Sequence, residues 1–396
     1  MYINIVSAFI TLISSLVFNI LIVRSSTFEV IGDFFVFLLF SQIGMIIFDL
    51  GFRNYYLGFY SKVRDKEAGY LKVIIPRLMS FSIVISITLF FMAFLASIFY
   101  NEMALLITAF IFGVVTYNNT FLVQSNYIRG RGLLSGFSSL LFDIIRLTSV
   151  TSLILYSEIN STNLIICNIA ARIIAILPFF VEYKFFSKSK LTFRIGLRLI
   201  IKIFNKTKSN YLLSLTSLGS TKVNDILLAS LLASAFLAKY NIAMQMPSAA
   251  LRVFELLKGS LLKLLSRYNC ASVILRGGVF LSVGLFGIYI TREILERIFV
   301  MMYHNNDEDI MNGFLFLCNW IVITITNYIF VLKIIQIKKS GALSMINLVF
   351  SIVSIFVSYF IILNMGFLGA FYSINIMASL SLLMSSLYLF RYRNIK

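Results

Sequence analysis

The stretch FDLGFRNYY, residues 48–56, closes an apolar run that begins near Phe34, and it carries Asp49 and Arg53 one helical turn apart. The run is long enough to cross a bilayer as a helix. Apolar runs of this length recur along the whole chain of 396 residues, of which 60% are hydrophobic and only 13% are charged. No soluble domain has enough interior to bury that much apolar surface. The sequence therefore predicts an all-α polytopic membrane protein.

Twelve apolar segments predict twelve transmembrane helices. The first segment lacks the basic start and the small-residue cleavage site of a signal peptide, so it is counted as a helix. The segments cover residues 3–23, 33–58, 73–99, 104–128, 134–157, 164–186, 209–233, 240–262, 277–299, 312–335, 342–363 and 367–390.

The longest polar connection lies between the sixth and seventh segments. In it, basic residues recur every four positions, at Arg194, Arg198, Lys202 and Lys206. This spacing draws one cationic stripe along a helix whose other faces are apolar, so it predicts an amphipathic helix on the cytoplasmic surface. The predicted organisation is a six-helix bundle over residues 1–190, this linker helix over 191–206, and a second six-helix bundle over 207–396.

Lys and Arg are distributed unequally between the two sets of loops. Most of them, Lys333 included, lie in the C-terminal tail and in loops that follow even-numbered segments, whereas the opposite loops carry only Arg24, Lys239, Arg292 and Arg297. By the positive-inside rule, both termini are cytoplasmic. The net charge of +18 is spread over short loops next to the membrane. This pattern indicates attraction to anionic membrane lipid, not nucleic-acid binding.

The sequence offers no catalytic set and no resident cofactor. Its single histidine, His304, stands among Asp307, Glu308 and Asp309 in the external loop 292–311, where a solvated acidic loop is a simpler interpretation than a metal site. The three cysteines are not spaced as metal ligands, and no GxxxxGK[ST] phosphate loop occurs. We therefore predict that the chain is not an enzyme and needs neither metal nor cofactor.

Among the ionisable side chains inside the predicted transmembrane segments, ten are candidates for a functional site. If all ten faced lipid, their insertion would cost about 25–35 kcal/mol, which is more than the free energy of unfolding of a typical protein. They are therefore expected to face one another or a water-filled cavity. Because the cations outnumber the acids, this cavity is expected to be net cationic. The acids are Asp49, Asp143, Asp225 and Glu255, and the cations are Arg53, Arg146, Arg172, Lys222, Arg252 and Lys258.

Most of these charges have an opposite charge one turn away on the same helix, whereas Arg172 has none. Such pairs either hold the bundle together or serve a substrate. We predict that the six cations contact an anionic head group, and that the four acids hold them in place or exchange protons. The pairs are Asp49–Arg53, Asp143–Arg146, Lys222–Asp225, Arg252–Glu255 and Glu255–Lys258.

Several features together resemble the Wzx-type O-antigen flippases, in the polysaccharide-transporter branch of the MOP superfamily of exporters, which also holds the MATE antiporters. They are the chain length, the twelve segments, the short loops, the basic midpoint linker, the D-L-G-F element at 49–52 and YNIAMQMPSAA at 240–250. The resemblance implies a MATE-like fold, with two six-helix bundles around a cationic central cavity. It singles out Asp49 within the D-L-G element.

The resemblance also implies a function. In the bacterial inner membrane, such a flippase moves an undecaprenyl-pyrophosphate-linked O-antigen repeat unit, a lipid-linked oligosaccharide, to the outer leaflet during lipopolysaccharide biosynthesis. Arg and Lys suit the pyrophosphate of this substrate. Coupling to a proton or sodium gradient, and association with the polysaccharide polymerase machinery, are left open.

Two other functions remain open from the residues alone. A MATE-like antiporter of small molecules or ions shares the expected fold, but a cationic substrate calls for an acidic cavity. A membrane-embedded O-antigen polymerase is also polytopic and basic, but chemistry on the outer face calls for a larger external loop than 292–311. The surplus of cations in the core favours the flippase.

Overall fold

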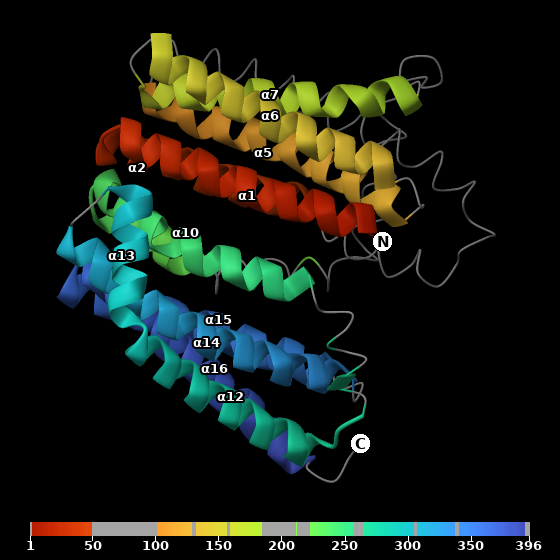
Figure 1. Ribbon diagram of the computed structural model, residues 1–396, viewed down its shortest axis with the longest axis vertical. Coiled ribbons are helices and arrows are strands. Elements are labelled where there is room, and N and C mark those ends of the chain that lie inside the picture. Colours follow the sequence, from red (N-terminus) through yellow and green to blue (C-terminus); the bar gives the residue numbers. More distant parts are fainter. Residues whose placement is uncertain are drawn as a thin grey trace. The chain divides into compact units, whose positions relative to one another are not determined.

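The computed structural model (Figure 1) describes residues 2–49, 101–128, 132–156, 159–183, 211, 222–256, 261, 264–265, 267–304, 307–336 and 340–392. Every regular element among these residues is a helix, and eight of the helices are long and apolar enough to cross a membrane. The predicted fold class, an all-α multi-pass membrane protein, is confirmed. The predicted segment 73–99 and the predicted linker helix 191–206 lie outside the described residues.

The chain divides into two compact units. Unit 1 comprises residues 1–18 and 33–218, and unit 2 comprises residues 19–32 and 219–396. Helices α1 (Tyr2–Ser25) and α2 (Phe28–Asp49) therefore contribute to both units, and the turn between them belongs to unit 2.

Unit 1 is built around α5 (Asn101–Ile128), α6 (Gly132–Tyr156) and α7 (Ser161–Tyr183), which all pack against one another. Small residues set the helix spacing. A Cβ atom on Gly113 of α5 would lie 2.4 Å from the Ser41 carbonyl oxygen of α2, so only glycine allows this approach.

Unit 2 is organised around α14 (Glu308–Gln336), which packs against α10 (Ser234–Leu256), α12 (Cys270–Ile290) and α16 (Phe367–Arg391). Helix α15 (Ser340–Met365) packs mainly against α16. Residues 222–231 form a further helical stretch ahead of α10.

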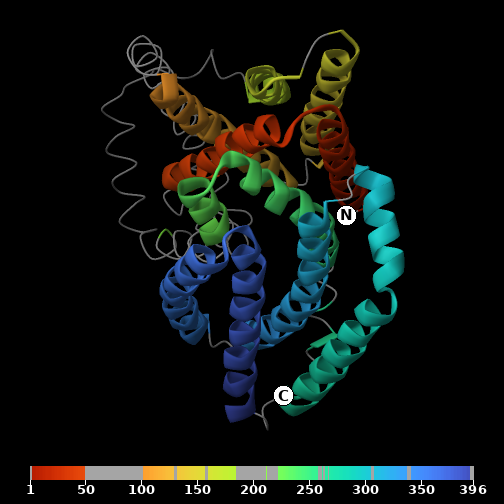
Figure 2. The same cartoon turned by 90° about the vertical axis from the view of Figure 1, so that its left-hand side faces the viewer.

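One predicted segment, 277–299, is wrong because the chain forms two helices there. Helix α12 ends at Ile290, and α13 (Arg292–Tyr303) follows in a different direction (Figure 2). The break lies at Thr291, whose backbone N–H and hydroxyl both donate to the Gly287 carbonyl oxygen, at 2.9 and 2.8 Å. The predicted external loop 292–311 is therefore largely helical.

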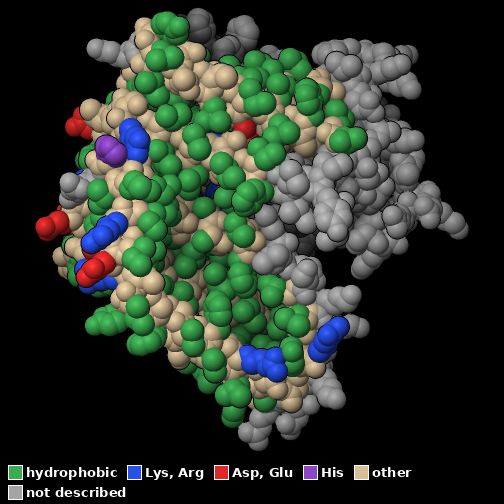
Figure 3. Space-filling model, viewed as in Figure 1, with side chains coloured by type: hydrophobic (Ala, Val, Ile, Leu, Met, Phe, Trp, Pro, Cys, Tyr) green, Lys and Arg blue, Asp and Glu red, His purple; other side chains and the backbone are tan. Residues whose placement is uncertain are grey.

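The outer faces of unit 2 suit a membrane. Hydrophobic side chains cover most of the visible length of its helices, and charged side chains lie near the helix ends (Figure 3). On α12, large apolar side chains that are more than half exposed recur every three or four residues, at Leu275, Val279, Val283, Phe286 and Ile290. This spacing marks one lipid-facing stripe.

Candidate substrate-binding site

Among the described residues, the densest group of intramembrane charges lies in unit 1, on α6 and α7. Asp143 and Arg146 occupy one face of α6, and the distance from Arg146 Nη2 to Asp143 Oδ1 is 3.4 Å. Their side chains are only 2% and 12% exposed. The spacing of three residues that predicts this pair is thus realised inside the helical bundle.

Arg172 on α7 joins this pair through an aromatic ring. Its guanidinium carbon lies 3.6 Å from the centre of the Phe142 ring, while that of Arg146 lies 4.9 Å from the same ring. Phe18 of α1 holds Arg146 from a second ring, at 4.2 Å. One phenyl ring therefore contacts both guanidiniums, which is a favourable arrangement for cations away from water.

The local sequence explains why α6 and α7 approach so closely here. Phe142 packs against Ala171 and Ala175, two small residues one turn apart on α7. The Ser138 hydroxyl also donates to the Ala175 carbonyl oxygen at 2.6 Å. Small residues and a hydroxyl at the contact are typical of packed membrane helices.

This group, which we call the arginine cluster (Phe18, Phe142, Asp143, Arg146 and Arg172), carries two cations and one acid. Several buried polar atoms in and beside it have no hydrogen-bond partner among the described residues, namely Asp143 Oδ2, Arg172 Nε and Asn168 Oδ1. Asn168 precedes Arg172 by one turn of α7. Buried polar groups without partners are costly, and a bound anion would relieve Arg172 Nε.

A second pair of predicted site residues lies in unit 2. Lys222 Nζ donates to Asp225 Oδ2 at 2.8 Å, one turn away on the helical stretch 222–231. Between them in the sequence, Asn224 donates to the Ala370 carbonyl oxygen at 3.0 Å and accepts from the Ser373 hydroxyl at 2.9 Å. These bonds tie the stretch to α16.

The other predicted site residues are placed less completely. Asp49 is the last residue of α2 and is 7% exposed. Arg252 lies on α10 with an exposed side chain. Arg53, Lys258 and the side chain of Glu255 lie outside what the structure describes, so the three pairs predicted for them stay predictions.

The aromatic residues of the arginine cluster could not be predicted from residue spacing within one helix. Phe18 contacts Arg146, and Phe142 contacts Arg172, only because three helices converge. The signal in the sequence is weak, since Phe142 is one of 40 phenylalanines.

Lys333, counted above as a loop charge, belongs instead to α14 and is fully buried. Its ammonium donates to the carbonyl oxygens of Leu265 and Tyr268, at 3.2 and 2.7 Å. It therefore ties the segment before α12 to α14.

Metal ligation is not supported by the part of the chain that the structure describes. Within these ranges, no three His, Cys, Asp or Glu side chains gather as a metal ion requires. Asp307, expected in a solvated loop, forms an ion pair with Lys239.

Comparisons with known proteins identify the fold. No protein-family profile and no curated protein matches the sequence. Among solved structures, the lipid II flippase MurJ in an inward closed conformation matches at 15% identity and a TM-score of 0.65, covering 99% of this chain and 88% of that one.

Two further structures match over nearly the whole chain. An inward-facing MATE multidrug transporter of the MOP superfamily matches at 13% identity and a TM-score of 0.61, covering 96% of this chain and 94% of that one. A MOP-superfamily transporter from Pyrococcus furiosus, described as having a binding pocket of reverse polarity, matches at 14% identity and a TM-score of 0.53, covering 98% and 95%. These proteins are transporters and a flippase, not enzymes. At such identities the likeness concerns the fold, and the chain has the fold of the MOP-superfamily transporters.

Proposed function

We propose that this protein moves an undecaprenyl-pyrophosphate-linked O-antigen or related polysaccharide repeat unit from the cytoplasmic to the outer leaflet of the bacterial inner membrane. The observation that carries the proposal is the arginine cluster, in which two guanidiniums lie over one phenyl ring inside an apolar bundle and only one of them, that of Arg146, pairs with the carboxylate of Asp143. Because the cluster carries two guanidiniums and one carboxylate, its net positive charge suits an anion.

A pyrophosphate fits this chemistry. Guanidiniums bind phosphate oxygens through paired, charge-assisted hydrogen bonds, which are roughly twice as strong as neutral ones. The ring of Phe142 lies against the Arg172 guanidinium, and Arg172 Nε has no hydrogen-bond partner among the described residues, so this donor can serve a ligand. The isoprenoid tail of the substrate would remain in the lipid.

The remaining cations, Arg53, Lys222, Arg252 and Lys258, are proposed to complete head-group binding in a central cavity during alternating access. Asp143 is proposed to balance the arginine cluster, and Asp225 to hold Lys222 at 2.8 Å. Asp49 and Glu255 are the further candidates for exchanging a proton or sodium ion with a membrane gradient. The match to a lipid II flippase makes a lipid-linked substrate compatible with this fold.

We further propose that both termini are cytoplasmic, in accordance with the positive-inside rule. The end of unit 2 that carries α13 would then face the outside of the cell.

A MATE-like antiporter is the second candidate, because multidrug MATE transporters share the fold. A cationic drug, however, would meet two arginines against one aspartate in the arginine cluster. The Pyrococcus furiosus transporter, described as having a pocket of reverse polarity and a different function, provides a precedent for such a change on this fold.

The test is the location of the lipid-linked sugar intermediate in cells that lack the protein. The deletion strain is complemented with wild type, Arg172→Ala or Arg276→Ala at equal membrane abundance. Arg276 is the matched control, because its guanidinium also lies over an aromatic ring, Tyr268 at 3.8 Å, but in unit 2.

We expect wild type and Arg276→Ala to clear the intermediate from the cytoplasmic leaflet, and Arg172→Ala to leave it there. An intermediate that is already outside but unpolymerised in the deletion strain would refute the flippase and support a polymerase. Full clearance by Arg172→Ala would refute the arginine cluster as the head-group site.

A further inference from the structure

The turn between α1 and α2 is fastened to unit 2, although both helices continue into unit 1. Residues 19–25 of α1 and 28–32 of α2 group with unit 2, and the rest of both helices groups with unit 1. Any movement of one unit against the other must therefore bend these helices or release the turn. Whether the helices bend or the turn is released depends on how strongly the turn is bound to unit 2.

The first contact is made by Arg24 at the end of α1. Its Nη2 donates to the Met301 carbonyl oxygen at 2.6 Å, and its Nε donates to the Met302 carbonyl oxygen at 2.9 Å. Both carbonyls lie in the last turn of α13, where helix carbonyls lack intrahelical partners and the helix dipole favours a cation. Arg24 thus caps α13 from a distant part of the chain.

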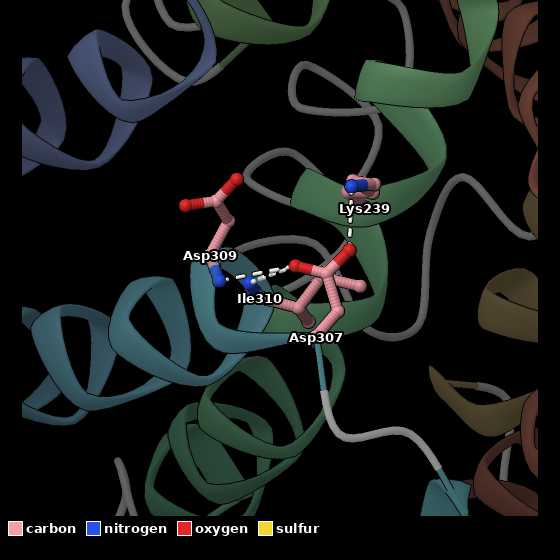
Figure 4. Close-up of polar contacts among 4 residues, drawn as sticks. All are labelled: Lys239, Asp307, Asp309 and Ile310. Atoms are coloured by element: carbon pink, nitrogen blue, oxygen red, sulfur yellow. Dashed lines mark hydrogen bonds and ion pairs between the residues drawn. The ribbon is translucent and has the colours of Figure 1, made fainter.

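The second contact joins α10 to the start of α14 (Figure 4) and reaches α2 through Phe28. Lys239 of α10 lies 5.5 Å from the centre of the Phe28 ring, and its ammonium is 2.5 Å from Asp307 Oδ2. The other carboxylate oxygen of Asp307 accepts from the backbone N–H groups of Asp309 and Ile310, at 3.0 and 3.3 Å. Asp307 therefore caps the start of α14 with one carboxylate oxygen while the other pairs with Lys239.

The third contact is steric. A Cβ atom on Gly32 of α2 would lie 2.1 Å from the Ser234 carbonyl oxygen at the start of α10. Only glycine lets α2 approach α10 this closely. Arg24 and Gly32 thus contact unit 2 directly, Phe28 does so through Lys239, and Asp307 acts on the turn only by holding Lys239 in place.

We propose that Arg24, Phe28 and Gly32, together with Lys239, Asp307 and the last turn of α13, form a latch that fixes the α1–α2 turn to unit 2 and opens once in each transport cycle. The proposal rests on alternating access, but not on the identity of the substrate. Most of the latch is polar and partly exposed, so water can replace its bonds when it opens. The steric contact at Gly32 restores the same register when it closes.

The state of the latch can be read from the accessibility of a cysteine introduced at a buried position of α2 next to the turn. Ile31 of α2 is 1% exposed. We would replace the native cysteines Cys167, Cys270 and Cys318 in the full-length chain, introduce Ile31→Cys, and measure its labelling rate with a maleimide in nanodiscs.

Two variants weaken the latch, and one serves as control. Arg24→Gln removes the charged cap of α13, and Asp307→Asn breaks the ion pair while keeping an N-cap acceptor. Arg297→Gln removes an exposed charge from α13, the same helix. We expect labelling to accelerate about tenfold in Arg24→Gln and Asp307→Asn, because each loses roughly one charge-assisted hydrogen bond. Arg297→Gln should label at the wild-type rate.

Equal labelling rates in all variants, each with the thermal unfolding midpoint of wild type, would overturn the latch. Arg172→Ala, which belongs to the arginine cluster, is added to separate the two proposals. If Arg172→Ala clears the lipid-linked intermediate in cells but Arg24→Gln still accelerates labelling, the substrate proposal fails and the latch stands. If Arg172→Ala blocks clearance but Arg24→Gln leaves labelling unchanged, the latch alone fails.

Discussion

The contact between Phe142 and Arg172 can be measured as a coupling free energy. Phe142→Leu keeps an apolar side chain and both arginines but removes the ring that lies 3.6 Å from the Arg172 guanidinium carbon. A cation–π contact stabilises by about 0.5–1 kcal/mol at the surface and by about 2 kcal/mol when desolvated. Phe142 is 7% exposed, so the desolvated figure applies.

A double-mutant cycle with Phe142→Leu and Arg172→Met should therefore give a coupling of about 2 kcal/mol. The same cycle with Arg146→Met should give less, because Arg146 lies 4.9 Å from the ring. The assay is reversible unfolding of the purified protein in mixed micelles, measured for the wild type, both single variants and the double variant.

The control cycle pairs Phe142→Leu with Arg276→Met, whose guanidinium contacts a different ring, that of Tyr268. Its coupling should be zero within about 0.5 kcal/mol, as for independent sites. A Phe142–Arg172 coupling that is no larger than this control would refute the ring as a holder of Arg172. It would also remove the geometric basis of the arginine cluster.

Three further predictions concern stability, each read from unfolding curves. Asn224→Ala should lose about 1–3 kcal/mol, since it removes two interhelical hydrogen bonds to α16, and no loss would contradict those bonds. Gly113→Ala should destabilise by about 1–3 kcal/mol through crowding, whereas Gly278→Ala, which meets open space, should stabilise slightly; equal effects would contradict the close packing. Burial raises the pKa of Asp307, but its hydrogen bond and ion pair with Lys239 and two backbone donors outweigh burial, so its net pKa is lowered. The stability that Asp307 contributes should therefore be constant above about pH 4 and be lost as pH falls through the lowered value, so Asp307→Asn should differ from wild type only above that range.

Segment length and apolarity were enough to predict most helices. The segments 312–335 and 367–390 correspond to α14 (Glu308–Gln336) and α16 (Phe367–Arg391). The break at Thr291 escaped prediction, because hydropathy does not register a change of direction, although four charged residues follow the break within 292–297. The bonds from Thr291 to Gly287 that end α12 are local, but threonine makes such bonds within helices too.

The candidate site was predictable only where it is local. The pairs Asp143–Arg146 and Lys222–Asp225 follow from helical periodicity. The position of Arg172 over the Phe142 ring depends on the packing of α6 on α7, which one sequence does not reveal.

The prediction that Lys333 is a loop charge was wrong because of contacts that are distant in sequence. A count of loop charges treats every lysine near a helix end as solvated, whereas the carbonyls of Leu265 and Tyr268, far away in sequence, keep this one buried.

The most direct test of the central claim is the rate at which purified protein in liposomes moves an undecaprenyl-pyrophosphate-linked glycan between leaflets, read by a membrane-impermeant oxidant of the sugar. Wild type and Arg276→Ala should accelerate this movement over protein-free liposomes, and the double variant Arg146→Ala with Arg172→Ala should not. Movement at the protein-free rate for wild type, in a preparation that transports a cationic drug instead, would contradict the flippase and establish the antiporter.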